Sequence, residues 1–232
     1  MPETIRAVLL DAGGTLFRLR GSVGEIYADI AARHGWQLDP QRLEERFQEV
    51  FPQMSPLCFP GVPPSALHRL ERRWWYKLVE RVMGPGQGVD FDSLFNEVFA
   101  HFATGSAWEL FSETFDTLEL LRRRRLRLAI VSNFDARLLQ ICDDLDLSSR
   151  VDAVLASGRS GFAKPDPRIF HMALRRLGAH PSEALHVGDS EREDLQGAHS
   201  AGMRAVLLRR HAQPGEQRPE TIPDLTHLSE WL

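Results

Sequence analysis

The chain has 232 residues, of which 43% are hydrophobic and 26% charged, and its formal net charge is -4. This length can bury a sizeable core, either in one large domain or in two unequal ones. The slightly acidic charge gives no reason to expect nucleic acid or an anionic membrane as a partner. The only cysteines, Cys58 and Cys142, lack metal-ligand spacing and indicate a reducing compartment. With no signal-peptide pattern and no apolar run of membrane-spanning length, we expect a cytoplasmic protein.

The basic residues are strongly biased toward arginine. Residues 122–125 are all arginine, and we expect them to form a solvated end of a helix just before a strand. Lysine occurs only at Lys77 and Lys164. Because a compact ammonium group differs from a planar guanidinium, each lysine is a candidate for a specific role. Lys77 is expected on an exposed helix face.

A short apolar strand, residues 5–10, is followed by a long stretch without strand patterns. Helical patterns span residues 23–35, 40–51, 65–84 and 92–105, with breaker segments at 52–64 and 84–88. Asp39 and Pro40 form an expected helix start, since aspartate caps a helix and proline suits its first turn. Aromatic residues at helical spacing, with basic neighbours, are expected to be the core of this unit rather than a cofactor or nucleic-acid site: Trp74, Trp75, Phe95, Phe99 and Phe102.

The rest of the chain alternates strands and helices. Buried strands are predicted at 126–132, 151–157, 183–188 and 203–208, and helices at 136–145, 167–178 and 192–202. Such alternation predicts an α/β fold in which helices cover both faces of a parallel sheet. We therefore predict an α/β core domain, residues 1–20 and 110–232, and an inserted all-helical cap domain, residues 21–109.

Polar residues follow four of the predicted strands or begin the helices after them. They are Asp11 within the segment DAGGT, Ser132 with Asn133, Lys164 before a Pro-Asp-Pro helix start, and Asp189 with Asp194. Each alone could be a turn or a helix cap. Because ligands bind at the carboxyl ends of parallel strands, we expect all of them at one edge of the sheet.

Asp11 and Asp189 would repel each other there, and Mg²⁺ is a cation that carboxylate and backbone oxygens bind. An anion with several oxygens would then be surrounded by Lys164, by Ser132 and by Asn133. Asn133 would contact the anion through its backbone or its side chain. A phosphoryl group is the natural candidate, with Asp11 attacking in line to form an aspartyl-phosphate. Gly13 and Gly14 would let backbone N–H groups approach that anion.

These four motifs, in this order and with a helical insertion after the first, resemble the haloacid dehalogenase-like (HAD) hydrolase superfamily. The resemblance covers residues 5–208, and the segments IVSNFDARL, KPDPRIF, HVGDSERED, GEIYA and RRWW point to one branch of it. It implies a Rossmann-like sheet with a mobile cap, a small phosphorylated substrate, and Mg²⁺ as the cofactor.

The resemblance also implies a role for each matching residue. Asp11 would be the nucleophile, Ser132 would hydrogen-bond the phosphoryl group, and Lys164 would neutralise developing charge. Asp189, the Asp11 carboxylate and the Gly13 carbonyl would ligate Mg²⁺, while Asp194 would orient Lys164 or metal-bound water.

Gly13 departs from the family pattern, because phosphatases of this superfamily usually carry an acid-base aspartate there. General acid-base help is worth about 10²–10⁴-fold. We therefore expect a phosphohydrolase of low or narrow activity that favours acyl or aryl phosphates, whose leaving groups need little protonation.

Two other functions stay open. One is a catalytically weak module that binds a phosphorylated metabolite. The other is a 2-haloacid dehalogenase, since halide leaves without a proton and Arg42 or Arg46 could help to hold it; the retained Asp189 argues against this. A Schiff-base role for Lys77 has no supporting pattern. The substrate is not predicted, and the protein could be a monomer or a homodimer.

Overall fold

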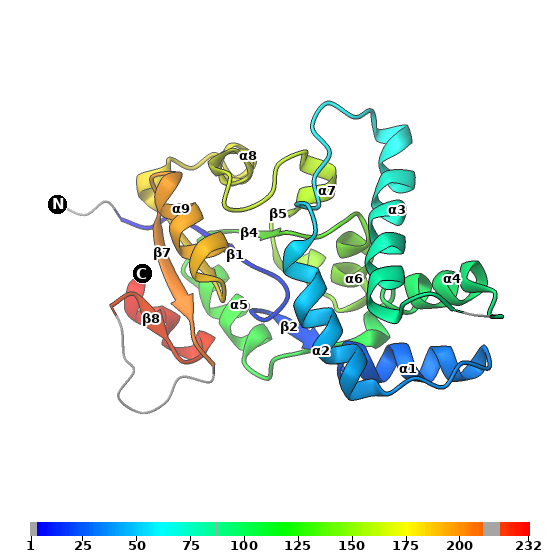
Figure 1. Cartoon of the computed structure of the whole chain (residues 1–232). Helices are drawn as coiled ribbons and strands as arrows, with labels where there is room; N and C mark the ends of the chain where they lie inside the picture. Colours follow the sequence, from blue (N-terminus) through cyan, green and yellow to red (C-terminus); the bar gives the residue numbers. More distant parts are fainter. Residues whose placement is uncertain (1–3, 87, 211–218) are drawn as a thin grey trace.

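The computed structural model describes residues 4–86, 88–210 and 219–232. Residues 1–3 and 211–218 of the predicted core domain, and Gln87 of the predicted breaker 84–88, lie outside this description. Within the described residues, a six-stranded parallel sheet carries helices on both faces, and four further helices form a separate unit beside it (Figure 1). The α/β prediction is confirmed.

The central strand of the sheet is β1 (Ala7–Leu10), which pairs with β4 (Arg127–Ser132) and β6 (Ala184–Gly188). Beyond β4 lies β5 (Ala153–Ala156), and beyond β6 lie β7 (Arg204–Leu208) and β8 (Thr221–Ile222). The chain therefore leaves β1 toward one edge and later returns to build the other. Such a switch point leaves a crevice at the carboxyl ends of the central strands.

Both faces of the sheet are buried, which explains why its strands read as continuous apolar runs. Val8 and Leu10 pack with α5 (Thr114–Arg123), α6 (Arg137–Asp144) and a C-terminal 3-10 helix (Leu225–Trp231). Ala7 and Leu9 pack with α8 (Pro167–Leu177) and α9 (Gly197–Ser200) on the opposite face. A short helix, α7 (Ser157–Ser160), follows β5.

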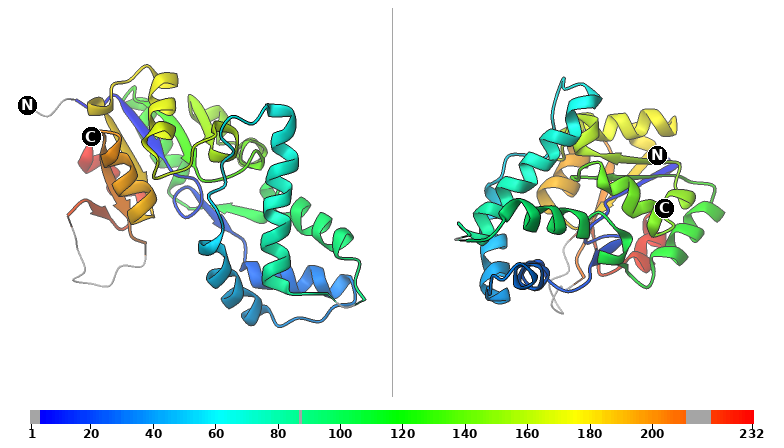
Figure 2. Two further views of the ribbon diagram at one scale, coloured as in Figure 1. Left: turned by 45° about the horizontal axis from the view of Figure 1, so that its top comes forward. Right: turned by 90° about the vertical axis from the view of Figure 1, so that its right-hand side faces the viewer.

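The separate unit, called the helical unit below, consists of α1 (Val23–Arg33), α2 (Pro40–Val50), α3 (Pro64–Met83) and α4 (Phe91–His101). Figure 2 shows it standing to one side of the sheet. It has its own apolar cluster, which contains the five predicted aromatic residues, Trp75 and Phe102 only partly buried. Asp39 caps α2, as predicted, by accepting a hydrogen bond from the Arg42 backbone N–H at 2.9 Å.

A small antiparallel sheet joins the helical unit to the parallel sheet. It pairs β2 (Phe17–Leu19) with β3 (Trp108–Leu110), and three-residue strands are too short to be predicted from periodicity. The helical unit also contacts the loop after β4. The Glu71 carboxylate of α3 accepts a hydrogen bond from the Ala136 backbone N–H at 3.1 Å, and the Trp75 indole N–H donates to Asp135.

The predicted helix 192–202 is only partly an α-helix. Residues Glu191–Gln196 form a π-helical turn, and α9 begins at Gly197. The Ser190 carbonyl accepts hydrogen bonds from both Asp194 and Leu195, which widens this first turn. Gly197 then passes close to the backbone of Pro165, since a Cβ at position 197 would lie 3.0 Å from the Pro165 Cα. Wide turns of this kind are frequent at functional sites.

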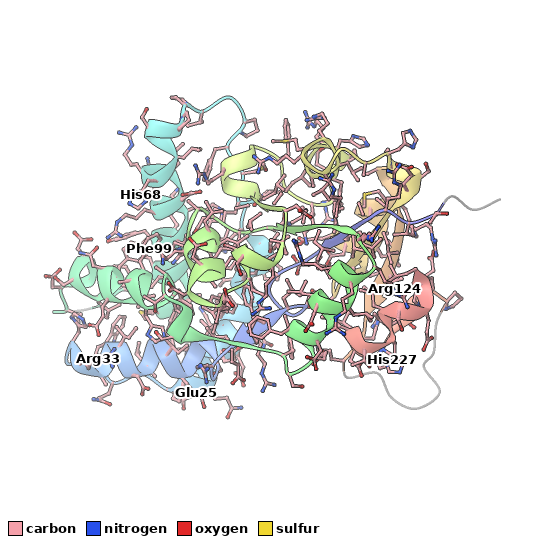
Figure 3. All side chains as sticks on the ribbon, turned by 180° about the vertical axis from the view of Figure 1, so that it is seen from behind. Glu25, Arg33, His68, Phe99, Arg124 and His227 are labelled. Carbon is pink, nitrogen blue, oxygen red and sulfur yellow. The ribbon has the colours of Figure 1, made fainter. Side chains whose placement is uncertain are left out.

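The structure confirms the expected positions of arginines 122–125 and of Lys77. Residues 122–125 are exposed at the C-terminal end of α5, where Arg124 donates to the Ser229 carbonyl at 3.4 Å. Figure 3 shows Arg124 near His227, at the opposite end of the molecule from Arg33. Lys77 is exposed on α3. Within the described ranges, none of the helices has the length and apolarity needed to cross a bilayer.

Candidate active site

Asp11 stands at the carboxyl end of β1, as predicted. Its backbone N–H donates to the Val187 carbonyl of β6 at 2.8 Å, and the residue is 6% exposed. The chain then turns back on itself, because the Ala12 carbonyl accepts the Leu16 N–H at 2.8 Å. Gly14 has a φ of +79°, and a Cβ there would lie 2.2 Å from an Asp189 carboxylate oxygen. Glycine is therefore required at this position by both conformation and space.

Arg210 holds this turn from the other side. Its guanidinium donates to the Gly14 carbonyl at 3.2 Å and to the Thr15 carbonyl at 2.8 Å, and it pairs with Glu113 at 2.6 Å. Both charged side chains are largely buried, so the pair fixes the turn firmly. Arg210 was not predicted to belong to the site. It follows the last predicted strand, residues 203–208, and no local sequence pattern marks it.

Lys164 links two of the predicted acids. Its ammonium group lies 2.6 Å from the Asp11 carboxylate and 2.5 Å from the Asp194 carboxylate. Burial alone would lower the pKa of Lys164, but the two carboxylates raise it, so the ammonium stays charged. The only lysine of the parallel-sheet region is therefore a fixed positive charge beside Asp11.

Asn133 holds Lys164 in place rather than reaching outward with its side chain. The Asn133 amide donates to the Lys164 carbonyl at 2.9 Å and accepts the Lys164 backbone N–H at 2.7 Å. The same amide donates to the Glu193 carboxylate at 2.8 Å. Burial raises the pKa of Glu193, which lies in the π-helical turn. Glu193 is a site residue that sequence reasoning missed, because no local pattern distinguishes it from Glu191 in the segment SERED.

Asp194 is fully engaged by protein groups. One oxygen is shared by Lys164 and by the His186 ring, 2.8 Å away, and the other accepts the Ser190 backbone N–H at 2.9 Å. Burial would raise the pKa of Asp194, yet Lys164 and His186 hold it well below its usual value. Gly188 makes room for this carboxyl, since a Cβ there would lie 2.1 Å from it.

Asp189 is an exposed acid of the site. Desolvation of its carboxyl group by the surrounding protein, together with repulsion from Asp11 and Asp194, nevertheless raises its pKa to about 7. Oxygens of these three acids lie within 4.8 Å of one another. Three carboxylates face one ammonium, which is the excess of negative charge that a hard divalent cation relieves. Because the Asp194 oxygens are already engaged, Asp11 and Asp189 are the carboxylates that fit Mg²⁺.

The remaining predicted residues lie at the same edge or far from it. Ser132 is buried at the end of β4, and Gly13 is half-buried in the turn after Asp11. Apart from Gly13 itself and its two chain neighbours, no described heavy atom lies within 4 Å of the point where a Gly13 Cβ would be. Arg42 and Arg46, the candidates for holding a halide, are exposed on α2, and Arg46 faces Glu49 at 3.7 Å.

Comparison with known proteins identifies the class of protein that carries this site. The model of the haloacid dehalogenase-like hydrolase family matches residues 5–202. The chain therefore belongs to this family of hydrolases.

Among curated relatives, the chain is 37% identical to "Haloacid dehalogenase-like hydrolase domain-containing protein 3" of Homo sapiens, over 88% of this chain and 82% of that protein. This is the branch to which the sequence segments point. A "Phosphoserine phosphatase" of Thermus thermophilus is 39% identical over 54% of this chain and 50% of its own length.

Solved structures confirm the fold. The HAD phosphatase from Thermococcus onnurineus has a TM-score of 0.68 at 23% identity, covering 98% of this chain and 97% of its own. The L-2-haloacid dehalogenase from Xanthobacter autotrophicus with chloropropionic acid covalently bound has a TM-score of 0.70 at 18% identity, covering 98% of both chains. Phosphatases and dehalogenases share this fold, so the chemistry must be argued from the residues of the site.

Proposed function

We propose that the protein is a Mg²⁺-dependent phosphohydrolase that forms an aspartyl-phosphate on Asp11 and acts on phosphates with good leaving groups. The observation that carries this proposal is the Lys164 ammonium between Asp11 and Asp194, with the Asp189 carboxylate close to both acids. In a dehalogenase reaction, in which a halide leaves, Asp189 would have no chemical role. The phosphatase relative of Thermus thermophilus supports the same chemistry.

In the first step a carboxylate oxygen of Asp11 attacks phosphorus, an Asp11–O–P bond forms, and the bond to the leaving oxygen breaks. The electron pair departs with the leaving oxygen. In the second step water attacks phosphorus, which releases phosphate and restores the Asp11 carboxylate; solvent takes up the proton.

Lys164 has two tasks in this proposal. Burial raises the pKa of Asp11, and the neighbouring ammonium opposes that shift and so favours the ionised nucleophile. The same charge stabilises the phosphoryl oxygens as they gather negative charge. Asp194 keeps the ammonium in place.

Ser132 and the backbone N–H groups of Gly13 and Asn133 would bind the phosphoryl oxygens. The Gly14 N–H, which was expected to approach the anion as well, is instead donated to the Phe17 carbonyl at 2.8 Å. Asp11, Asp189 and the Gly13 carbonyl would hold Mg²⁺, which supplies charge neutralisation between the phosphoryl group and the acids. We further propose that the helical unit, approximately residues 21–109, is the cap that covers the site. Its contacts from Glu71 and Trp75 to the loop after Ser132 and Asn133 support this role.

Gly13 determines which substrates turn over well. In this proposal nothing at position 13 protonates the leaving oxygen, so alkyl phosphates would be slow. Acyl and aryl phosphates expel stable anions, so the absence of an acid at position 13 would slow their hydrolysis much less.

Hydrolysis of acetyl phosphate by purified protein tests the proposal. We expect turnover with Mg²⁺, loss of turnover with EDTA, and loss in Asp11→Asn. Asp29→Asn, an exposed acid of α1, is the matched control and should keep full activity. Failure of wild-type protein to hydrolyse any acyl or aryl phosphate with Mg²⁺ would sink the proposal.

Gly13 favours one second candidate, a module that binds a phosphorylated metabolite without turning it over. In that case a phosphonate would bind with Mg²⁺, binding would be lost in Lys164→Ala, and acetyl phosphate would stay intact.

A further inference from the structure

A cavity of about 210 Å³ lies between the helical unit and the strands that join it to the parallel sheet. All four helices of the unit or their ends contribute to its wall, and most of the lining side chains are aromatic, among them Tyr27, Trp75, Phe99, Trp108 and Phe134. A dry cavity of about 150 Å³ is enough for benzene. This cavity can therefore hold a substituted phenyl ring.

Arg137 is the only charged residue of the cavity wall among the described residues, and its charge is already compensated. It lies 2.7 Å from the Asp135 carboxylate and donates to the Phe99 carbonyl at 3.1 Å. Its guanidinium stacks over the Phe99 ring at 4.0 Å and the Trp75 ring at 4.8 Å. Figure 3 labels Phe99 near His68 in the helical unit. The wall thus suits an uncharged ring, with no second anion required.

The cavity wall and the phosphate site share two chain segments. Phe134 of the wall follows Ser132 and Asn133 directly, and its N–H donates to the Ser132 carbonyl at 2.9 Å. Leu19 of the wall lies in β2, whose Phe17 carbonyl accepts the Gly14 N–H at 2.8 Å. The segments that carry the nucleophile and the phosphate-binding serine therefore continue into the cavity.

We propose that this cavity receives the leaving group of the substrate and that the substrate is an aryl phosphate with a single, uncharged ring. The inference rests on the proposed function and selects among its activated phosphates. Two independent observations converge on it: the aromatic cavity, and the glycine at position 13. A phenolate leaves without a proton donor, so Asp11–O–P bond formation and P–O(aryl) cleavage need no acid there, and water later protonates the phenolate.

Binding of two phosphonates, measured by calorimetry with Mg²⁺, tests the ring directly because neither compound can be hydrolysed. Phenylphosphonate should bind on the order of tenfold to a hundredfold more tightly than methylphosphonate, the factor expected for burying a phenyl ring. Equal affinities would overturn the inference.

Two valines of the helical unit provide a matched pair of variants. Val23 lines the cavity, whereas Val89 packs against the same apolar cluster outside it. Val23→Phe should fill the cavity and remove the preference for phenylphosphonate, and Val89→Phe should keep it. Leu19→Phe, which fills the cavity from β2, should repeat the result of Val23→Phe. If both cavity-filling variants, Val23→Phe and Leu19→Phe, still bind phenylphosphonate more tightly than methylphosphonate, the proposed binding of the ring in this cavity is contradicted.

Turnover separates this inference from the proposed function. With Mg²⁺, wild-type protein should hydrolyse phenyl phosphate at least tenfold faster, as kcat/KM, than cyclohexyl phosphate, which has a similar shape and a poor leaving group. Hydrolysis of acetyl phosphate without any preference for the phenyl compounds would sink the inference and leave the proposed function standing. Tight phenylphosphonate binding without hydrolysis of any phosphate would contradict the proposed function and leave the ring site standing.

Discussion

Removing the charge of Asp189 should stabilise the metal-free protein and remove its response to Mg²⁺. The pKa of Asp189 is raised from 3.8 to about 7 by the protein around its carboxyl group, which desolvates it, and by the repulsion of Asp11 and Asp194. Between these two pH values the unfolded chain has lost this proton while the folded protein keeps it. The folded state therefore loses stability as pH rises from about 4 to 7, and at pH 8 the full cost is present.

The size of the effect follows from the shift. A rise of about three pH units corresponds to at most about 4 kcal/mol, and the exposure of Asp189 reduces this to roughly 1–2 kcal/mol. For a chain of this length, each kcal/mol shifts Tm by about 2–4 °C. Asp189→Asn should therefore raise Tm by roughly 2–8 °C at pH 8 in EDTA.

Thermal unfolding of both proteins at pH 8 and pH 5, in EDTA and in Mg²⁺, measures this. The advantage of Asp189→Asn should shrink at pH 5, where wild-type Asp189 is protonated. Mg²⁺ at about 100 times its Kd should stabilise wild-type protein by about 2.7 kcal/mol and the variant much less. Asp29→Asn should follow wild-type protein throughout.

A lower Tm for Asp189→Asn than for wild-type protein in EDTA at pH 8 would contradict this prediction, because the carboxylate would then be stabilising rather than repelled. An equal gain in Tm from Mg²⁺ for variant and wild-type protein would contradict the assignment of Asp189 as a metal ligand.

Three further substitutions test other parts of the site. Gly13→Asp has open space beside it and should raise hydrolysis of ethyl phosphate more than tenfold; an unchanged rate would mean that the missing acid does not limit the enzyme. Arg210→Lys loses the paired contacts to the Gly14 and Thr15 carbonyls and should lower the free energy of unfolding in urea by about 1–3 kcal/mol, together with kcat; an unchanged kcat would show that the turn needs no such support. Gly188→Ala should force Asp194 away from Lys164, costing about 1–3 kcal/mol and most activity, whereas normal activity would show that this contact is not needed.

The centre of the site was predictable because it depends on regular structure. Asp11, Ser132 and Asp189 each end or follow an apolar run, and parallel strands must present their carboxyl ends together. Lys164 was marked by its rarity in an arginine-rich chain. In the structure its ammonium group contacts both Asp11 and Asp194.

The supporting contacts were not predictable, because each joins residues far apart in the chain. Arg210 reaches back to Gly14 from beyond β7, and Glu71 of α3 reaches the Ala136 backbone. Asn133 was expected to contact phosphate through its backbone or side chain, but its side chain holds the Lys164 backbone. No local pattern distinguishes such a role.

The aromatic residues show a second limit of sequence reasoning. Their helical spacing predicted correctly that Trp74, Trp75, Phe95, Phe99 and Phe102 pack together. Spacing on single helices could not show that the packed rings leave a cavity, because this depends on how α1–α4 meet β2, β3 and Phe134.

Mass spectrometry of acid-quenched protein can show whether Asp11 carries the phosphoryl group during turnover. After brief mixing with phenyl phosphate and Mg²⁺, the peptide containing Asp11 should carry the mass of one phosphoryl group. The label should be absent from Asp11→Asn, which should also lose turnover. Turnover without label on this peptide in wild-type protein, or continued turnover by Asp11→Asn, would contradict the account.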